Sequence, residues 1–122
     1  MVRYQQVFQA NITDGTSLSN EVNLTLPNNS SPIYMFLIMP AVWNGTAITF
    51  QASDEQGGTY KNVYDTGGTE ISLTVANNRV IVPTAAIQAA LTSLTHIKIR
   101  SGSSATPVNQ QDDRSIKIIA TT

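Results

Sequence analysis

Apolar residues alternate with polar ones along much of this chain, and this alternation constrains the fold most strongly. Successive side chains of a β-strand point to opposite faces, so apolar residues at every second position are typical of a strand with one buried face. Such runs lie at Val2–Ile12, Leu18–Leu26, Ile48–Ala52, Ile71–Val75, Ile97–Ile99 and Ile116–Ile118. Turn-forming residues separate them every 10 to 17 residues, the spacing of sandwiches and barrels. The pattern predicts an all-β, antiparallel β-sandwich of about eight to nine strands.

One segment departs from this period and favours a helix. Thr84 can cap a helix, and apolar residues follow at the spacing of one helical face: Ile87, Ala90, Leu91 and Leu94. We therefore expect one short helix near residues 84–94, packed over one end of the sandwich. The length of 122 residues suits a single domain over 1–122, in which residues 1–6 could form an N-terminal arm.

The segment before Asn44-Gly45 is apolar on both faces. This dipeptide favours a type I′ hairpin, which would place Ile48 opposite Ala41 and Phe50 opposite Met39. The odd-numbered residues of the first strand then point into the core. The even-numbered residues point the other way, yet they are apolar as well: Tyr34, Phe36, Ile38 and Val42. Either the short helix or a partner chain covers this second face, or the register is wrong.

The composition excludes several classes of protein. Charged residues make up 12% of the chain and the net charge is −1, so a dense basic stripe for nucleic acid is not expected. With 41% hydrophobic residues and little net charge, disorder by charge repulsion is excluded as well. No apolar run is long enough to span a bilayer. The first residues lack the apolar stretch of a secretory signal, so we expect synthesis in a cytosol and no membrane partner.

Candidate catalytic and metal-binding residues are few. The sequence holds no cysteine and one histidine, His96, which alternation places on the outward face of its strand. The adjacent acidic pairs Asp54-Glu55 and Asp112-Asp113 lie beside turn signals, where aspartate commonly forms turns. We expect no catalytic residue, no cofactor and no metal ligand, although a loop Ca²⁺ site near either pair stays open. Trp43, Tyr60 and Tyr64 could instead form a sugar-binding platform or simply pack against neighbouring strands.

Three stretches together resemble a known protein family. They are Ile48–Ser53 with Gly57–Tyr60 and Val63–Asp65, then Val82-Pro83 with the helix that follows, then Leu94–Gly102 with Pro107–Gln110 and Asp113-Arg114. Their order resembles small virion proteins of tailed bacteriophages, in particular β-sandwich head decoration (cement) proteins. The resemblance covers roughly residues 46 to 120 and rests on turns and loops. It implies a jelly-roll-like fold, no enzymatic activity and no cofactor.

The resemblance also implies a function and a partner. A decoration protein binds the major capsid protein on the capsid surface of the virion and stabilises the shell, here as an expected homo-oligomer. Related sandwiches serve in tails and baseplates, and a carbohydrate-binding module is an alternative of another class. Loops and chain ends are expected to make the contacts, namely Met1–Gln6, Asn28–Pro32 and Gly102–Asp113. The candidate interface residues are Tyr34, Phe36, Ile38 and Val42 on the doubly apolar segment, with Tyr4, Asn29, Pro107 and Asn109 outside it.

Overall fold

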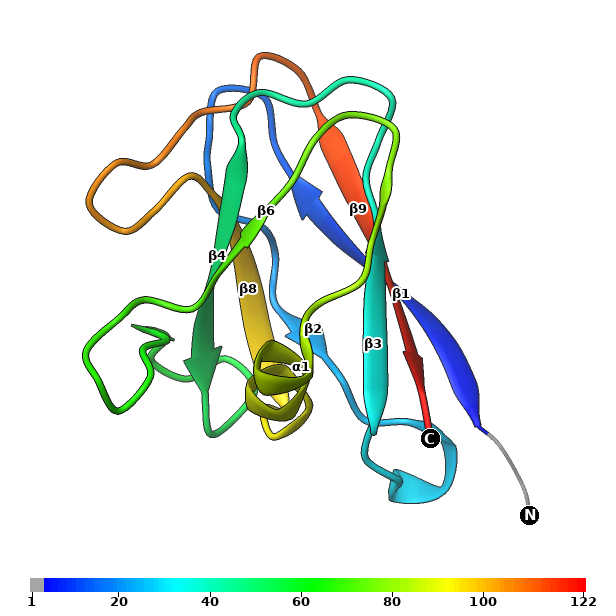
Figure 1. The fold of residues 1–122 in the computed structure, drawn as a ribbon. Coiled ribbons are helices and arrows are strands. Elements are labelled where there is room, and N and C mark those ends of the chain that lie inside the picture. The colour runs from blue at the N-terminus through cyan, green and yellow to red at the C-terminus, as the bar shows by residue number, and fades with distance from the viewer. Residues whose placement is uncertain (1–3) are drawn as a thin grey trace.

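Two antiparallel sheets face each other in the computed structural model, which describes residues 4–122 (Figure 1). Sheet A has the order β1 (Gln5–Ile12), β9 (Arg114–Thr121), β3 (Tyr34–Ile38) and β7 (Val80–Ile81). Sheet B has the order β2 (Val22–Asn23), β8 (His96–Ser101) and β4 (Ala47–Ser53), with β5 (Lys61–Asn62) and β6 (Ser72–Thr74) on the far side of β4. A short 3₁₀ turn, Pro27–Asn29, precedes β3. The predicted all-β sandwich is confirmed.

The strand order is that of a jelly roll. β5 and β6 both pair antiparallel with the same side of β4. β5 pairs with Gln51 and Ala52, and β6 pairs with Ala47 to Thr49. They therefore form one interrupted strand, and the sandwich has eight strands in two four-stranded sheets. With β5 and β6 taken as one strand, the chain changes sheet at every step except the β4–β5 hairpin. This is expected for two interlocked Greek keys. The jelly-roll-like fold that the resemblance implied is thus present.

Alternation correctly predicts which residues fill the core. The inward side chains of β4, β8 and β9 are completely or almost completely buried: Ile48, Phe50, Ile97, Ile99, Ile116 and Ile118. The segment Leu18–Leu26 was expected to be one strand, but only Val22–Asn23 is a strand, flanked by an isolated bridge from Leu18 to Arg100. Its buried residues still follow the period of two, because Val22, Leu24 and Leu26 all lie in the core.

The predicted Asn44-Gly45 hairpin is wrong. β3 and β4 lie in different sheets, so the link between them crosses the sandwich instead of closing a two-residue turn. Gly45 has a positive φ of 101°, whereas Asn44 does not adopt the positive φ that a type I′ turn also requires there. The backbone of Asn44 is held by the Gln110 side chain, which accepts from its N–H at 3.0 Å and donates to its carbonyl at 2.8 Å.

Gln110 connects three loops at this end of the sandwich. Its side chain is completely buried. Besides binding Asn44, its backbone accepts a hydrogen bond from Gly15 N–H and donates one to the Thr16 carbonyl. The loops after β1, β3 and β8 therefore meet at one residue, at the top of Figure 1. A long-range contact of this kind sets the path of the β3–β4 link, which local turn chemistry alone does not predict.

The predicted helix is α1 (Ala85–Thr92), with Thr84 at the N-cap position but no side-chain capping bond. Leu91 is completely buried, and Ile87 and Leu94 pack against the same core. The helix lies beside β3 and closes the open side between the two sheets (Figure 1). The apolar side of the helix is therefore buried inside the sandwich.

Gln88 of this helix takes the place of a strand. Its side-chain amide accepts from Met35 N–H at 2.8 Å and donates to the Met35 carbonyl at 2.6 Å. β7 pairs with β3 only at Leu37 and Ile38, so Met35 lies beyond the end of β7. The glutamine thus satisfies two backbone groups that would otherwise lack a partner at a half-covered sheet edge.

We expect Gln88→Ala to lower the free energy of unfolding by about 1–3 kcal/mol, because both Met35 backbone groups lose their partner in a partly buried place. Urea unfolding, followed by the fluorescence of the buried Trp43, measures the loss. Gln56→Ala, at an exposed position of the β4–β5 link, is the matched control. Equal stabilities of the two variants would contradict the role assigned to Gln88.

Candidate interaction surface

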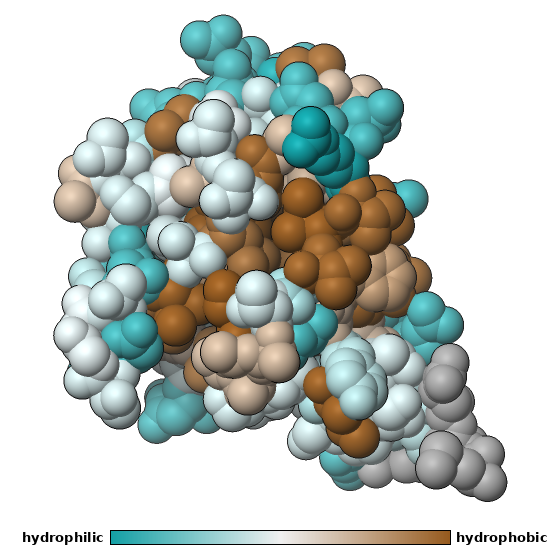
Figure 2. All heavy atoms as spheres, in the orientation of Figure 1, coloured by the Kyte–Doolittle hydropathy of each residue, from teal (hydrophilic) through white to brown (hydrophobic). Residues whose placement is uncertain are grey.

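The outward side of sheet A is apolar although it faces solvent. We call it the apolar face; it consists of Val7, Tyr34, Phe36, Ile38, Val80, Val82 and Ile119. The ladder register places Ile119 between Val7 and Phe36, and Ile38 beside Val80. Tyr34 is 62% exposed and Val82 is 71% exposed. Figure 2 shows hydrophobic residues gathered around β7 and β3, at the edge of this face.

Charge is almost absent from this surface. Among the outward positions of the four strands of sheet A, within residues 4–122, the charged residue is Lys117, which lies between Gln9 and Ile38. The remaining outward residues of β1 are neutral glutamine and asparagine, Gln5 and Asn11. Depletion of charge at the centre of an apolar patch is what distinguishes an interface core from ordinary surface.

The helix does not cover the apolar face, so the first of the two predicted covers is wrong. α1 buries Leu91 between the sheets and meets β3 through Gln88, at the side of sheet A. The parity of the doubly apolar segment was nevertheless predicted correctly: Met35, Leu37 and Met39 are buried. Parity depends only on the two-residue period of a strand, and it holds although the hairpin from which it was inferred does not exist.

The structure brings together only part of the candidate interface. Tyr34, Phe36 and Ile38 lie on β3, within the apolar face. Val42 is 56% exposed but lies in the β3–β4 link, beyond the end of β3. Tyr4 pairs with Thr122 at the end of the molecule that holds the C-terminus, and Asn29 lies in the 3₁₀ turn near the same end (Figure 1). Pro107 and Asn109 are exposed in the β8–β9 loop.

The end of the predicted N-terminal arm belongs to a strand. Gln5 and Gln6 belong to β1 and pair with Thr121 and Ala120 of β9. Residues 1–3 lie outside the described part of the chain. Any contact surface built from this region therefore includes a strand edge in place of a free segment.

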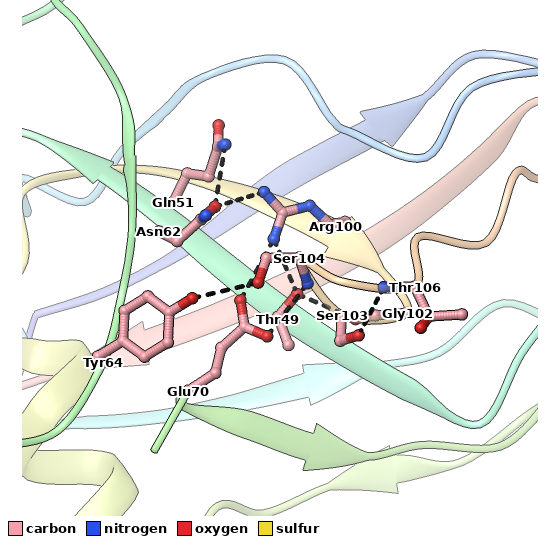
Figure 3. A network of polar contacts seen from close by, with 10 residues as sticks. All are labelled: Thr49, Gln51, Asn62, Tyr64, Glu70, Arg100, Gly102, Ser103, Ser104 and Thr106. Carbon is pink, nitrogen blue, oxygen red and sulfur yellow. Dashed lines mark hydrogen bonds and ion pairs between the residues drawn. The ribbon is translucent and has the colours of Figure 1, made fainter. Parts of the chain in front are cut away.

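A buried polar network on the outer side of sheet B was missed by sequence reasoning (Figure 3). Arg100, 7% exposed, donates to Asn62 Oδ1 at 2.6 Å and to Thr49 Oγ1 at 3.3 Å, and it forms an ion pair with Glu70 at 3.4 Å. Glu70 in turn accepts from the Ser104 backbone N–H at 3.1 Å. Alternation correctly places Arg100 outward, but no local pattern connects it to a partner 30 positions away.

This network fastens two loops to sheet B. One is the hairpin between β5 and β6, which carries Tyr64 and Glu70; the other begins at Gly102 and includes Ser104. Thr49 donates to the Gly102 carbonyl at 2.9 Å, and the Tyr64 hydroxyl lies 3.3 Å from the Ser104 hydroxyl. The arginine therefore holds together the surface loop in which Pro107 and Asn109 are displayed.

A second cluster joins the loop before β2 to the β4–β5 hairpin. Glu21 accepts hydrogen bonds from the Tyr60 hydroxyl at 2.6 Å and from Gly57 N–H at 2.9 Å, and Lys98 lies 4.6 Å above the Tyr60 ring. The Tyr60 bond, the Gly57 bond and the charges of Lys98 and His96 lower the pKa of Glu21 below its ordinary 4.5. Burial and the bond to Glu21 raise the pKa of Tyr60 to about 12.

These shifts predict a pH dependence with a defined sign. Glu21 has a lowered pKa in the folded state, so its contribution to stability is present above its unfolded value of 4.5 and disappears as the pH falls through the folded pKa. Tyr60→Phe removes the largest cause, and we expect it to raise the pKa of Glu21. Carbon-detected NMR titration of the carboxyl group measures this change. Tyr64→Phe, which alters a tyrosine bonded elsewhere, is the control and leaves the titration in place.

The aromatic residues do not form a sugar-binding platform. Trp43 is 6% exposed and belongs to the core, and Tyr60 is half-buried against Glu21 and Lys98. Tyr64 is exposed at a different loop. A platform needs coplanar exposed rings, so the three residues named for it do not serve that purpose together.

A surface cleft beside the β4–β5 link contains acidic side chains. It measures about 700 Å³, lies between the β4–β5 link and the end of α1, and is lined in part by Asp54, Glu55 and Lys61; His96 is not among its lining residues.

Within residues 4–122, no three His, Cys, Asp or Glu side chains lie close enough together to hold a metal ion. In the same range, no helix has the length and hydropathy needed to cross a membrane.

The fold of this chain is shared with a solved structure of another protein. No family model matches the sequence, and a search of curated proteins finds no match. Among solved structures, the chain is similar to the crystal structure of the SPBc2 prophage-derived protein YomS, with a TM-score of 0.57 and 13% sequence identity. The similarity covers 100% of this chain and 96% of that one. At this identity it shows that the two chains share a fold over their full lengths.

Proposed function

We propose that this protein is a structural virion protein of a tailed bacteriophage, and that it decorates the head by binding the major capsid protein. The sequence resemblance to head decoration proteins supports this assignment. The fold shared with a prophage-derived protein supports the broader association with phages. The apolar face carries the proposal, because four of its residues are more than half exposed on the outer side of the sandwich: Val7, Tyr34, Val80 and Val82.

The physical argument starts from the cost of leaving the apolar face in water. Val80 and Val82 are more than half exposed, and Val80 lies opposite Ile38 in the ladder register. Burying apolar area against another protein recovers roughly 25 cal/mol per Å². With one lysine on the outward side of sheet A, little charge has to be desolvated when a partner binds. Binding of this kind depends only weakly on salt.

Stabilisation of the capsid then comes from repetition. Each copy bridges neighbouring shell subunits through an interface of standard size or smaller, about 800 Å² per partner. Many modest contacts on one closed shell act together against internal pressure. The rigid sandwich holds the face in shape, while Gln110 fixes the loops at one end of the sandwich and Arg100 fixes loops on the opposite sheet. We propose that the protein acts in this way without catalysis and without a cofactor.

The test uses heads purified from particles that lack this protein. Wild-type protein is added, and both its binding to the heads and their heat resistance are measured. We expect Val82→Lys to abolish binding, because it places a charge in the most exposed part of the apolar face. Thr74→Lys, at an exposed position on β6 of the opposite sheet, is the matched control and keeps binding. Binding by Val82→Lys at wild-type level would overturn the proposal.

A second experiment distinguishes a head protein from a tail protein. Immunogold labelling of intact particles locates the protein on one or the other. Label on tails or baseplates, together with failure to bind expanded heads, would replace decoration by a tail role while leaving the apolar face as the binding surface.

A further inference from the structure

The edge of sheet A at β1 is open. β1 is the first strand of the sheet and pairs with β9 along all eight of its residues, and the described part of the chain provides no strand on its other side. Figure 1 shows the first half of β1 at the margin of the molecule. The strands at the other sheet edges, β7, β2, β5 and β6, are two or three residues long. Short edges resist pairing with other chains, whereas a long one is a template for it.

The direction of the backbone groups follows from the two ends of β1. At one end, Tyr4 exchanges hydrogen bonds with Thr122, the residue after the end of β9. The backbone groups of Tyr4 therefore point toward β9. At the other end, Asn11 exchanges hydrogen bonds with Asn20, which lies outside the sheet. The backbone groups of successive residues in a strand point alternately to its two sides. The N–H and C=O groups of Gln5, Val7 and Gln9 therefore point away from β9, as those of Asn11 do.

The open segment has defined limits and a symmetric sequence. Asn20 occupies both backbone groups of Asn11, so pairing by another chain is confined to Gln5–Gln9. The residues of this segment whose backbone groups point away from β9 are Gln5, Val7 and Gln9. Their sequence reads the same in both directions about Val7. β1 holds no charged residue, proline or glycine, the residues with which natural proteins protect an open edge.

We infer that two copies of this chain pair through β1, antiparallel, about a two-fold axis at Val7. Val7 then lies opposite Val7 of the other copy, and Gln5 lies opposite Gln9. Each of these three pairs exchanges two backbone hydrogen bonds, about six in all. The contact is isologous and self-complementary, as a two-fold requires. It makes one continuous eight-stranded sheet and joins the two apolar faces side by side.

The register is tested by charge. Gln5 and Gln9 are both exposed, so lysine or glutamate is tolerated there in the monomer. Gln5→Lys with Gln9→Lys opposes like charges across the axis, and we expect light scattering to show a mass of 13.2 kDa in place of twice that value. Gln5→Lys with Gln9→Glu opposes unlike charges at the same positions, and we expect the dimer to persist. A monomeric wild-type protein at about 100 µM, or a dimer that survives both double variants, would overturn the inference.

Cross-linking tests the axis itself. The chain has no cysteine, so Val7→Cys introduces a single thiol. In the proposed dimer the two thiols face each other, and we expect a short bismaleimide to link the chains almost completely. Val80→Cys, equally exposed on β7, is the control. Its two copies are separated by seven strand spacings, about 34 Å, and we expect no linkage. Equal linkage at both positions would contradict the two-fold at Val7.

This inference does not depend on the proposed function, and the two can fail separately. Val82→Lys lies three strands away from β1 and leaves the β1 dimer intact while abolishing head binding. A wild-type dimer that dissociates in Val82→Lys but not in the double-lysine variant would place the contact on the apolar face, and the pairing through β1 would be wrong.

Discussion

Arg100→Ala is expected to lower the free energy of unfolding by about 2–4 kcal/mol. The change leaves the Glu70 carboxylate, whose side chain is 14% exposed, without its cation, and it removes the donors to Asn62 and Thr49. Breaking a fully buried pair from one side costs about 3–5 kcal/mol, and the partial access of solvent to Glu70 reduces that figure. Urea unfolding followed by Trp43 fluorescence measures the loss. Arg79→Ala, at an exposed position, is the control for removing an arginine.

The origin of that loss is tested by a second substitution. If the cost arises from an uncompensated carboxylate, Arg100→Ala combined with Glu70→Ala is less unstable than the sum of the two single changes. We expect a coupling of about 1–2 kcal/mol between the two positions. Strictly additive effects would mean that Arg100 stabilises the fold through its bonds to Asn62 and Thr49 and through packing of its aliphatic part, and not through Glu70. Loss of the pair also frees the loop that carries Pro107, which increased hydrogen exchange at Ser104 would report.

Gly102→Ala is expected to cost about 3 kcal/mol. Gly102 has a φ of 83°, which disfavours any side chain by about 1–2 kcal/mol. A Cβ atom there would also lie 2.4 Å from the Thr106 carbonyl oxygen and 2.8 Å from the Val108 nitrogen. Both are backbone atoms of a closed turn, so they cannot rotate away, and the overpacking adds about 1–3 kcal/mol.

Gly68→Ala separates these two costs. Gly68 has almost the same φ, 84°, but a Cβ atom at this position would have no heavy atom within 4 Å. Its loss is therefore confined to backbone conformation, the same about 1–2 kcal/mol as at Gly102. Thermal unfolding of the two variants side by side measures the difference. If Gly68→Ala is as damaging as Gly102→Ala, the close approach of the backbone at Gly102 is not what requires glycine there.

The parts of the fold that follow from the sequence are those set by local periodicity. The alternation at Ile97 and Ile99 depends on residues next to each other in the chain, and so does the helical spacing of Ile87 and Leu91. Strand partners depend on distant residues. The Asn44-Gly45 turn failed as a prediction because Gln110, 66 positions away, holds the backbone of Asn44.

The candidate site follows the same division. The apolar positions Tyr34, Phe36 and Ile38 were recognised as facing away from the core, because parity is a local property. Val7 and Val82 complete the same surface, but only the strand order brings them there. The Arg100 network was not foreseeable, since the partners of the guanidinium come from β4, β5 and the loop between β5 and β6. From the sequence alone, an arginine on the outer face of a strand is expected to be exposed to solvent.

The Gln88 amide that caps Met35 has a consequence for aggregation. A β-rich chain with so little charge would normally be at risk of stacking into fibrils, since strands add readily to both margins of a bare sheet. Here the helix blocks growth beside the first half of β3, and β7 offers only two residues beyond it. Sheet A can extend in one direction alone. Because other chains can add to sheet A only at β1, we expect assembly through this sheet to stop at two copies and not to continue into a fibril.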